Sequence, residues 1–324
     1  MGFDASTDNN KFSDPFITSD GSTRASVKLK QLQTLWFNTG TLCNLACTNC
    51  YIESTPSNDR LEYIRLAEVQ QFLDEIQTDQ LPTDEIGLTG GEPFMNPDII
   101  PIMGAILRRG FRLLVLTNAM RPMAKLADQL LKLHKLYPQQ LTIRVSVDHY
   151  RPELHEEERG ARSWQPMLDG LCWLSNNGFN LDVAGRTLWG GDEQSLREGF
   201  AALFKQNNIA VDALDKKQLV LFPEMAEGKP VPEITTACWD ILDVKPDAMM
   251  CASSRMVVKR KGDPTPSVMA CTLLAYDQQF NLGSTLAEAS KTVQLNHPHC
   301  AAFCVLGVEV VLFRAKCRLN FNLK

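Results

Sequence analysis

From Leu35 onward, short apolar runs alternate along the chain with amphipathic stretches. The apolar runs predict strands at residues 35–39, 85–89, 113–116, 141–147, 181–184 and 219–222. The stretches between them carry apolar residues at helical spacing, which predicts helices over residues 66–76, 96–109, 123–136, 164–177 and 193–205. Six strands that alternate with helices in this way indicate parallel strands joined by right-handed crossovers.

This alternation fits an open doubly wound sheet as well as a barrel or partial barrel. In both folds, ligands bind at the carboxyl ends of the strands. Five polar motifs fall at that edge: a cysteine loop after the first strand, residues 90–93 after the second, residues 117–118 after the third, Asp148 after the fourth and Arg186 after the fifth. Their shared position predicts a single binding edge.

The remaining segments differ from this central part in composition. Residues 1–33 are rich in Ser, Thr, Asp and Asn without periodicity, which predicts a flexible N-terminal extension. After Pro223 the periodicity weakens and Gly, Pro and Cys become frequent, so we expect a domain boundary near residue 225. The expected organisation is an extension (1–33), an α/β domain (34–225), a cysteine-rich α+β module (226–307) and a tail (308–324).

Composition excludes several functional classes. The chain has 324 residues, of which 22% are charged, and its formal net charge of -5 argues against a nucleic-acid-binding surface. No apolar run reaches membrane-spanning length. The first residues are polar and acidic, unlike a secretory signal. We therefore expect a cytoplasmic protein that binds neither nucleic acid nor membrane.

Ten cysteines without a visible secretion signal favour metal binding or redox chemistry over a disulfide framework. Three of them, Cys43, Cys47 and Cys50, form a C-x3-C-x2-C pattern on one polar loop. Three thiolates can ligate three corners of a cubane iron–sulfur cluster and leave the fourth iron open. A zinc site would use the pair Cys47 and Cys50 and leave Cys43 over, and inert buried thiols would be the third possibility.

This spacing, followed by an aromatic residue and placed after the first strand of a β/α series, resembles the radical S-adenosylmethionine (SAM) superfamily. The resemblance implies a partial (β/α)6 TIM-like barrel and a [4Fe–4S] cluster. In that family the amino and carboxylate groups of SAM chelate the open iron. An electron from the cluster then cleaves the C5′–S bond, and the 5′-deoxyadenosyl radical abstracts hydrogen from a substrate.

A second motif, Gly90-Gly91-Glu92-Pro93, resembles the family signature that binds the amino group of SAM. Two glycines allow a ligand close to the backbone, and the carboxylate can pair with an ammonium group. The resemblance implies further SAM contacts from an aromatic residue near the adenine, from residues near the ribose and methionine parts, and from a cation for the carboxylate: Tyr51, Asn118, Ser146, Asp148 and Arg186.

The downstream cysteines frame a predicted hairpin, with strands near residues 256–259 and 268–270. The pattern of a cysteine, a hairpin, a second cysteine, a Leu-Gly segment and a closing pair resembles the auxiliary-cluster modules of radical SAM enzymes, the SPASM type and its shorter twitch form. The resemblance implies an auxiliary [4Fe–4S] cluster with four ligands: Cys251, Cys271, Cys300 and Cys304. Cys238, His297 and His299 are alternative ligands, and structural zinc is the competing interpretation.

The expected function is that of a radical SAM oxidoreductase or maturase acting on a peptide or small-molecule substrate, with an electron donor such as flavodoxin or ferredoxin. The auxiliary cluster would transfer an electron or position the substrate. Methyl transfer or carbon–sulfur bond formation at the same site is an alternative outcome. A non-catalytic zinc or electron-transfer protein is an alternative of a different kind, and it predicts no SAM cleavage.

Overall fold

The computed structural model describes residues 11–223 and 231–307. The chain divides into two compact units. Unit 1 comprises residues 1–30, 225–253 and 290–324, and unit 2 comprises residues 31–224 and 254–289. The division near residue 225 lies where we expected a boundary. The segment 254–289, which we expected in the C-terminal module, belongs instead to the unit that contains the predicted barrel.

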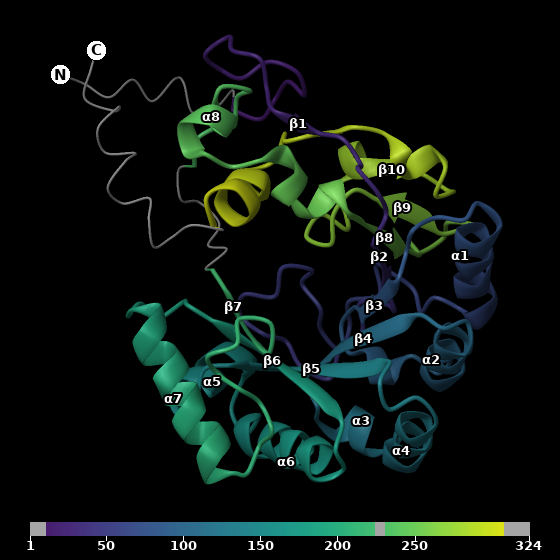
Figure 1. The fold of residues 1–324 in the computed structure, drawn as a ribbon, viewed down its shortest axis with the longest axis vertical. Helices are drawn as coiled ribbons and strands as arrows, with labels where there is room; N and C mark the ends of the chain where they lie inside the picture. Colours follow the sequence, from purple (N-terminus) through teal and green to yellow (C-terminus); the bar gives the residue numbers. More distant parts are fainter. Residues whose placement is uncertain (1–10, 224–230, 308–324) are drawn as a thin grey trace. The chain divides into compact units, whose positions relative to one another are not determined.

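Unit 2 is built on a sheet of nine strands in the order β10-β9-β8-β2-β3-β4-β5-β6-β7 (Figure 1). Its six consecutive neighbours β2 to β7 are all parallel, which confirms the predicted partial barrel. Their bounds are Thr34–Asn38, Glu85–Thr89, Arg112–Thr117, Leu141–Asp148, Asn180–Arg186 and Leu219–Phe222.

The helices that connect these strands lie where the apolar periodicity predicts them, except that the predicted helix 123–136 is divided into α3 and α4 and that one helix is additional. They are α1 (Leu66–Thr78), α2 (Ile99–Arg108), α3 (Arg121–Ala124), α4 (Ala127–Leu136), α6 (Trp164–Asn176) and α7 (Glu193–Gln206). The addition is α5 (Pro152–Arg159), in a segment where the periodicity predicted no helix. No helix within the described residues is long and apolar enough to cross a membrane.

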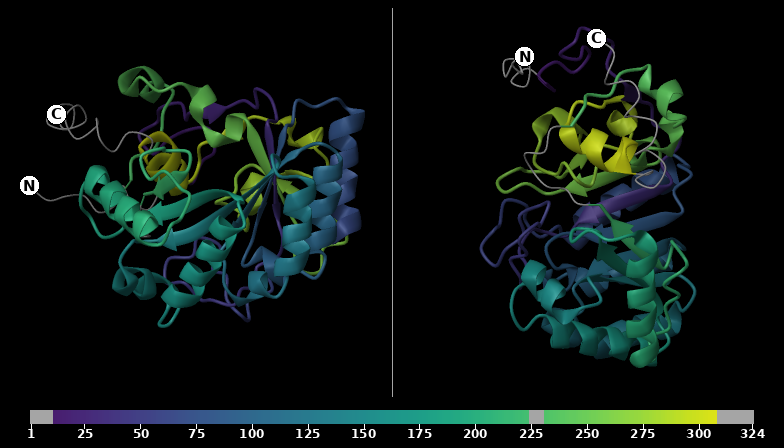
Figure 2. Two further views of the ribbon diagram at one scale, coloured as in Figure 1. Left: turned by 60° about the horizontal axis from the view of Figure 1, so that its bottom comes forward. Right: turned by 90° about the vertical axis from the view of Figure 1, so that its left-hand side faces the viewer.

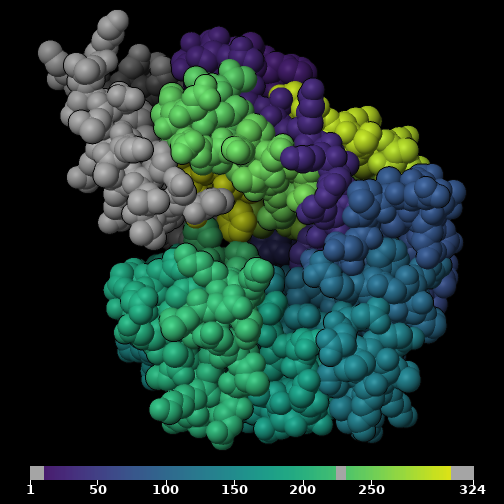
Figure 3. Space-filling model, viewed as in Figure 1, coloured from purple at the N-terminus to yellow at the C-terminus, as the bar shows by residue number. Residues whose placement is uncertain are grey.

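Alternation along the strands sends one set of side chains to the helices and the other to the inside of the barrel. On β2, Phe37 is fully buried and its ring meets that of Phe72 on α1 edge to face. On β5, the odd-numbered residues Leu141 to Val147 are buried, whereas Ser146 is half-buried. Helices α1 and α2 run side by side (Figure 2), and in the space-filling view the blue atoms of this part of the chain adjoin one another (Figure 3).

The predicted hairpin is confirmed as β8 (Ser254–Val258) and β9 (Ser267–Met269), which pair antiparallel, and β10 (Asn281–Gly283) continues it. Strand β8 also pairs in parallel with β2. The hairpin therefore covers the edge of the barrel sheet, where backbone N–H and C=O groups would otherwise lack partners. This pairing explains why the hairpin belongs to unit 2.

Unit 1 contains β1 (Ser26–Val27) paired with β11 (Val293–Gln294), the helix α8 (Cys238–Leu242) and a π-helical turn (Cys300–Val305). Residues 11–30, predicted to be a flexible extension, make defined contacts here. The Glu233 carboxylate accepts hydrogen bonds from the backbone N–H groups of Phe12 and Ser19 and pairs with Arg24. Fully buried Arg24 also donates to the carbonyl of Asp14. The composition of this segment does not reveal its ordering, because the ordering depends on contacts with Glu233, which lies far away in the sequence.

We expect Glu233→Gln to destabilise unit 1 by about 3–5 kcal/mol, because the substitution leaves the Arg24 guanidinium buried without its counter-charge. The side chains of Arg24 and Glu233 are 0% and 5% exposed. Hydrogen exchange measured by mass spectrometry should show faster exchange in peptides from residues 11–30. Asp240→Asn, an exposed acid of the same unit, is the matched control. Equal exchange in the two variants would contradict the prediction.

The same carboxylate predicts a pH dependence. Burial alone would raise the pKa of Glu233, but the N–H groups of Ser19 and Phe12 and the Arg24 guanidinium outweigh it and lower the pKa from 4.5 to about 2. A lowered folded-state pKa stabilises the protein above the unfolded value, and this stabilisation is lost as the pH falls. Wild-type protection of residues 11–30 should therefore decline between pH 4.5 and about 2, and this decline should be smaller in Glu233→Gln.

Candidate iron–sulfur and SAM site

The three clustered cysteines lie on the loop that follows β2, at the carboxyl edge of the barrel. Cys43 is buried, Cys47 and Cys50 are half-buried, and none of them forms a disulfide. Two of the sulfur atoms already face backbone donors. The Leu45 N–H lies 3.4 Å from Cys43 Sγ, and the Ser54 N–H lies 3.3 Å from Cys50 Sγ. Hydrogen bonds of this kind tune the potential of thiolate-bound clusters.

Asn118, predicted from its position after β4, holds the first half of this loop. Its side-chain amide donates to Asn44 Oδ1 at 2.9 Å, and its nitrogen lies 4.0 Å from Cys43 Sγ. Its Oδ1 accepts from the Met120 backbone N–H at 3.1 Å. The structure thus brings Asn118 and Cys43 together, as the shared edge predicted.

Glu92 connects the loops after β3 and β4. Its carboxylate accepts hydrogen bonds from the Phe94 N–H at 3.1 Å, the Thr117 hydroxyl at 2.8 Å and the Asn118 N–H at 2.9 Å. The residue is 2% exposed. Burial raises the pKa of Glu92 to about 7, while the Asn118, Thr117 and Phe94 donors oppose this shift. Glu92 therefore links the loops after β3 and β4, because its carboxylate accepts hydrogen bonds from both.

The two glycines before Glu92 permit a close approach between backbones. Gly90 has a φ of +148°, and a Cβ atom there would lie 2.6 Å from the Gly40 carbonyl oxygen. A Cβ at Gly91 would lie 2.3 Å from the Leu42 carbonyl oxygen. The Gly91 N–H donates to Gly40 and the Glu92 N–H to Leu42. The glycines thus allow the backbone after β3 to pack against the segment that leads from β2 into Cys43. We did not expect this contact from the motif.

Asp148 ends β5 and forms a bidentate pair with Arg159, with Nε–Oδ2 and Nη2–Oδ1 distances of 2.6 and 3.2 Å. Its φ of +43° falls beside a register shift in the β5–β6 pairing. Burial would lower the pKa of Arg159, but attraction to Asp148 and to the Cys47 thiol raises it. Burial raises the pKa of Cys47, and the Arg159 charge opposes that shift. A fixed cation therefore stands near the cysteine loop.

The other predicted SAM contacts also lie at this edge. Ser146 is half-buried on β5. Tyr51 follows the last cysteine of the loop, and burial raises the pKa of its phenol to about 12, against the opposing effect of Thr89. Arg186 ends β6, and its guanidinium pairs with Glu158 at 2.6 Å. Its predicted partner was the SAM carboxylate.

Sequence reasoning missed α5 and its acidic and basic side chains. Only one large apolar residue, Leu154, occurs between Pro152 and Arg159, so no periodicity marks a helix. Pro152 in the first turn and Gly160 after the last residue were the available signals, since proline favours helix starts and glycine helix ends. His149 and His155, which flank the start of α5, are buried, with 7% and 0% exposure.

The auxiliary-cluster residues are divided between the two units. Cys251, Cys300 and Cys304 lie in unit 1, and Cys271 lies in unit 2. Over residues 11–223 and 231–307, no group of three or more His, Cys, Asp or Glu side chains is arranged to hold a metal ion. Assignment of both ligand sets therefore rests on the motifs.

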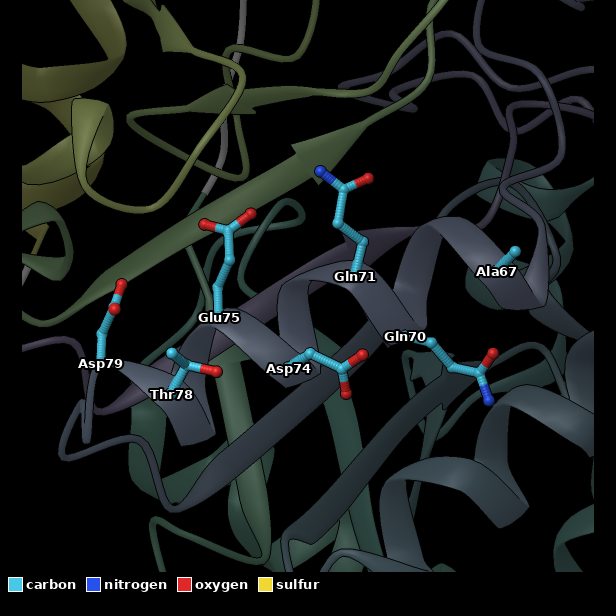
Figure 4. A pocket seen from close by; sticks show the side chains of 7 residues that line it. All are labelled: Ala67, Gln70, Gln71, Asp74, Glu75, Thr78 and Asp79. Carbon is cyan, nitrogen blue, oxygen red and sulfur yellow. The ribbon is translucent and has the colours of Figure 1, made fainter.

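A cavity of about 520 Å³ lies away from this edge, along the surface of α1 (Figure 4). Seven residues of that one helix and its end line it: Ala67, Gln70, Gln71, Asp74, Glu75, Thr78 and Asp79. Asp74 pairs with Arg109, and Glu75 accepts the Leu286 backbone N–H. These acids are thus engaged in packing α1 within unit 2, and the cavity shares no residue with the cysteine loop.

The residues at the carboxyl edge fit an iron–sulfur cluster. Three free thiols share one loop, two of them face N–H donors, and the Asp148–Arg159 ion pair lies nearby. The parallel partial barrel and this loop define a class of enzymes that use a metal cluster at the barrel mouth. The family model for the Radical SAM superfamily matches residues 37–201, more than half of the chain, and the chain belongs to that superfamily. Its members use a [4Fe–4S] cluster and SAM.

Several curated proteins resemble this chain. The antilisterial bacteriocin subtilosin biosynthesis protein AlbA of Bacillus subtilis is 28% identical over 54% of this chain and 37% of AlbA. The AdoMet-dependent heme synthase of Methanosarcina barkeri is 31% identical over 44% of this chain and 38% of that protein. A GTP 3′,8-cyclase of Haemophilus influenzae is 27% identical over 43% of this chain and 40% of that protein. The matches span about 40% of each of these relatives.

Two solved structures share the fold. SuiB of Streptococcus suis bound to S-adenosylmethionine aligns with a TM-score of 0.56 at 12% identity, over 78% of this chain and 63% of SuiB. The protein anSMEcpe with bound AdoMet aligns with a TM-score of 0.55 at 14% identity, over 86% of this chain and 84% of anSMEcpe. At these identities the likeness concerns the fold alone, and it agrees with the partial barrel of β2 to β7.

Proposed function

We propose that this chain cleaves SAM reductively and abstracts hydrogen from a peptide or small-molecule substrate. Cys43, Cys47 and Cys50 would hold the [4Fe–4S] cluster, which when bound supplies the electron for this cleavage. The observation that carries the proposal is the attachment of the cysteine loop to the carboxyl edge of a barrel within the segment matched by the family model.

The side chains at this edge divide into two groups by their present partners. Tyr51 and Ser146 belong to the group that we propose to face SAM. We propose that the amide of Asn118 contacts SAM as well, in addition to its present partners Asn44 and Met120. Glu92 and Asp148 have their carboxylates engaged by protein donors, and we propose that they organise the edge. This arrangement positions the loop before SAM arrives, so that little reorganisation is needed on binding.

The substrate class is supported only by the names of the relatives. AlbA is named for the biosynthesis of a bacteriocin, which favours a peptide, whereas the GTP 3′,8-cyclase is named for a nucleotide. We further propose an auxiliary [4Fe–4S] cluster on the C-terminal cysteines Cys251, Cys271, Cys300 and Cys304, supported by their pattern and by the confirmed hairpin. An electron donor such as flavodoxin or ferredoxin completes the proposal.

Anaerobic reconstitution with iron and sulfide tests the function. After reduction in the presence of SAM, iron per chain and 5′-deoxyadenosine are measured. We expect two clusters per chain and release of 5′-deoxyadenosine. Formation of S-adenosylhomocysteine in its place would indicate methyl transfer. A colourless protein that holds zinc and leaves SAM intact would overturn the proposal.

A further inference from the structure

The segment between Cys47 and Cys50 is attached to the end of helix α5. The Thr48 N–H donates to the Glu158 carbonyl at 2.9 Å, and the Thr48 hydroxyl lies 3.4 Å from the Glu157 carbonyl. The Asn49 N–H donates to Glu158 Oε1 at 2.9 Å, and its side-chain amide donates to Glu158 Oε2 at 2.8 Å. Asn49 therefore engages both oxygens of one carboxylate.

Arg186, the last residue of β6, contacts both Glu158 and Asn49. Its Nη1 lies 2.6 Å from Glu158 Oε1 and 3.3 Å from the Asn49 carbonyl oxygen. Both backbone polar groups of Asn49 are thus bound to the same ion pair. The side chains of Glu158 and Arg186 are 1% and 13% exposed. A carboxylate this deeply buried is stable only with its counter-charge and its hydrogen bonds in place.

Both side chains of the pair are already engaged by protein groups. The Glu158 oxygens accept three hydrogen bonds from Asn49 and Arg186. A carboxylate beside three thiolates would also repel them if it were unpaired. Arg186 cancels that charge while holding the loop backbone. The pair therefore fixes the spacing of Cys47 and Cys50 at no net charge.

We propose that Glu158 and Arg186 are positioning residues that preset the Cys47–Cys50 half of the loop for the cluster. The inference rests on the proposed function, since it assigns these cysteines as ligands. The pair acts through Asn49 and does not touch the reacting atoms. Outer partners that orient metal ligands change metal affinity by about 10–100-fold when they are removed, and this sets the size of the expected effect.

The test compares wild type with Glu158→Gln and with the double variant Glu158→Gln/Arg186→Gln. The single variant places an amide N–H against an Asn49 donor and leaves Arg186 without a counter-charge. The double variant removes both charges together, so it is expected to keep the fold, as checked by circular dichroism. Glu153→Gln is the matched control, because this residue lies on the same helix with its side chain 72% exposed.

The first readout is release of iron from the reconstituted protein to a chelator. We expect release about tenfold faster in both variants and unchanged in the control. The electron paramagnetic resonance spectrum of the reduced first cluster should shift in the variants as well, which a purely structural role elsewhere would not produce. Release at the wild-type rate with an unchanged spectrum in the folded double variant would overturn the proposal.

The second readout needs no cluster. In the apoprotein, alkylation of Cys47 and Cys50 by iodoacetamide should be faster in the double variant than in wild type, with Cys172 of α6 as the internal reference. If wild type holds no cluster but alkylation responds in this way, the proposed function fails, and the pair holds the loop without a role in positioning cluster ligands. If wild type holds the cluster and neither readout responds, the positioning role fails alone.

Discussion

Each of the substitutions Cys43→Ala, Cys47→Ala and Cys50→Ala is expected to lower 5′-deoxyadenosine formation by at least about 100-fold and to remove one of the two clusters. The loss should exceed that of an outer partner, because each change deletes a ligand directly. The loop offers no spare cysteine between residues 43 and 50 to replace it. Iron per chain and SAM cleavage after anaerobic reconstitution are the measurements.

The Cys43→Ala variant distinguishes an iron–sulfur cluster from a zinc site. A zinc site on the C-x2-C pair would depend on Cys47 and Cys50 and would tolerate Cys43→Ala. A cluster with three ligands requires all three. Cys43 is 6% exposed, and its sulfur lies 3.4 Å from the Leu45 backbone nitrogen, a donor that can stabilise a thiolate. Metal retained by Cys43→Ala but lost from Cys47→Ala would contradict the cluster.

Cys172→Ala serves as the control for these variants. This half-buried cysteine lies on α6 and has only a weak contact at 4.0 Å from its sulfur to the Asn207 carbonyl oxygen. Its removal should leave iron content and SAM cleavage unchanged. A comparable loss in this control would mean that the chain tolerates no cysteine change, and the effect at the loop would then carry no information on ligation.

The barrel strands and most helices were predictable because each buries an apolar face with a regular period. Helix α5 was not, because its residues pack through charge and hydrogen bonds: Glu158 with Arg186, and Arg159 with Asp148. Such pairs have no periodicity to detect. The same reason hid the ordering of residues 11–30 around Glu233. The sequence also could not place the β8–β9 hairpin, since any free sheet edge could accept it.

The site was predictable at the level of its motifs and less so at the level of contacts. All five polar motifs lie at one edge, as parallel strands require. The partners of Glu92, Asp148 and Arg186 are protein groups from other parts of the chain: the end of β4 for Glu92, and helix α5 for Asp148 and Arg186. A motif states which side chains are present, and only the folded chain determines which of them face each other.

Gly91→Ala provides the sharpest test of what the glycine motif does. The added Cβ would lie 2.3 Å from the Leu42 carbonyl oxygen and 2.7 Å from that of Thr41. Both are backbone atoms that cannot rotate away, so the two loops must separate. Overpacking of this kind typically costs about 1–3 kcal/mol. We expect a lower urea midpoint for the apoprotein and a smaller iron content after reconstitution, because Leu42 leads directly into Cys43.

Gly104→Ala is the matched control, since it adds the same methyl group to a buried glycine of α2. There the nearest atom is Nη1 of the exposed Arg108 at 3.1 Å, which can move aside. Alanine also favours a helix interior over glycine by roughly 0.5–1 kcal/mol, so this variant should be neutral or slightly stabilised.

The comparison decides between two roles for the motif. If Gly91 serves only the approach of SAM, the Gly91→Ala apoprotein should unfold at the wild-type urea concentration while its affinity for SAM falls. If Gly91 serves the backbone contact, stability falls before any ligand is present. The hydrogen bonds from Gly91 to Gly40 and from Glu92 to Leu42 favour the second outcome, because the added methyl group would have to break them.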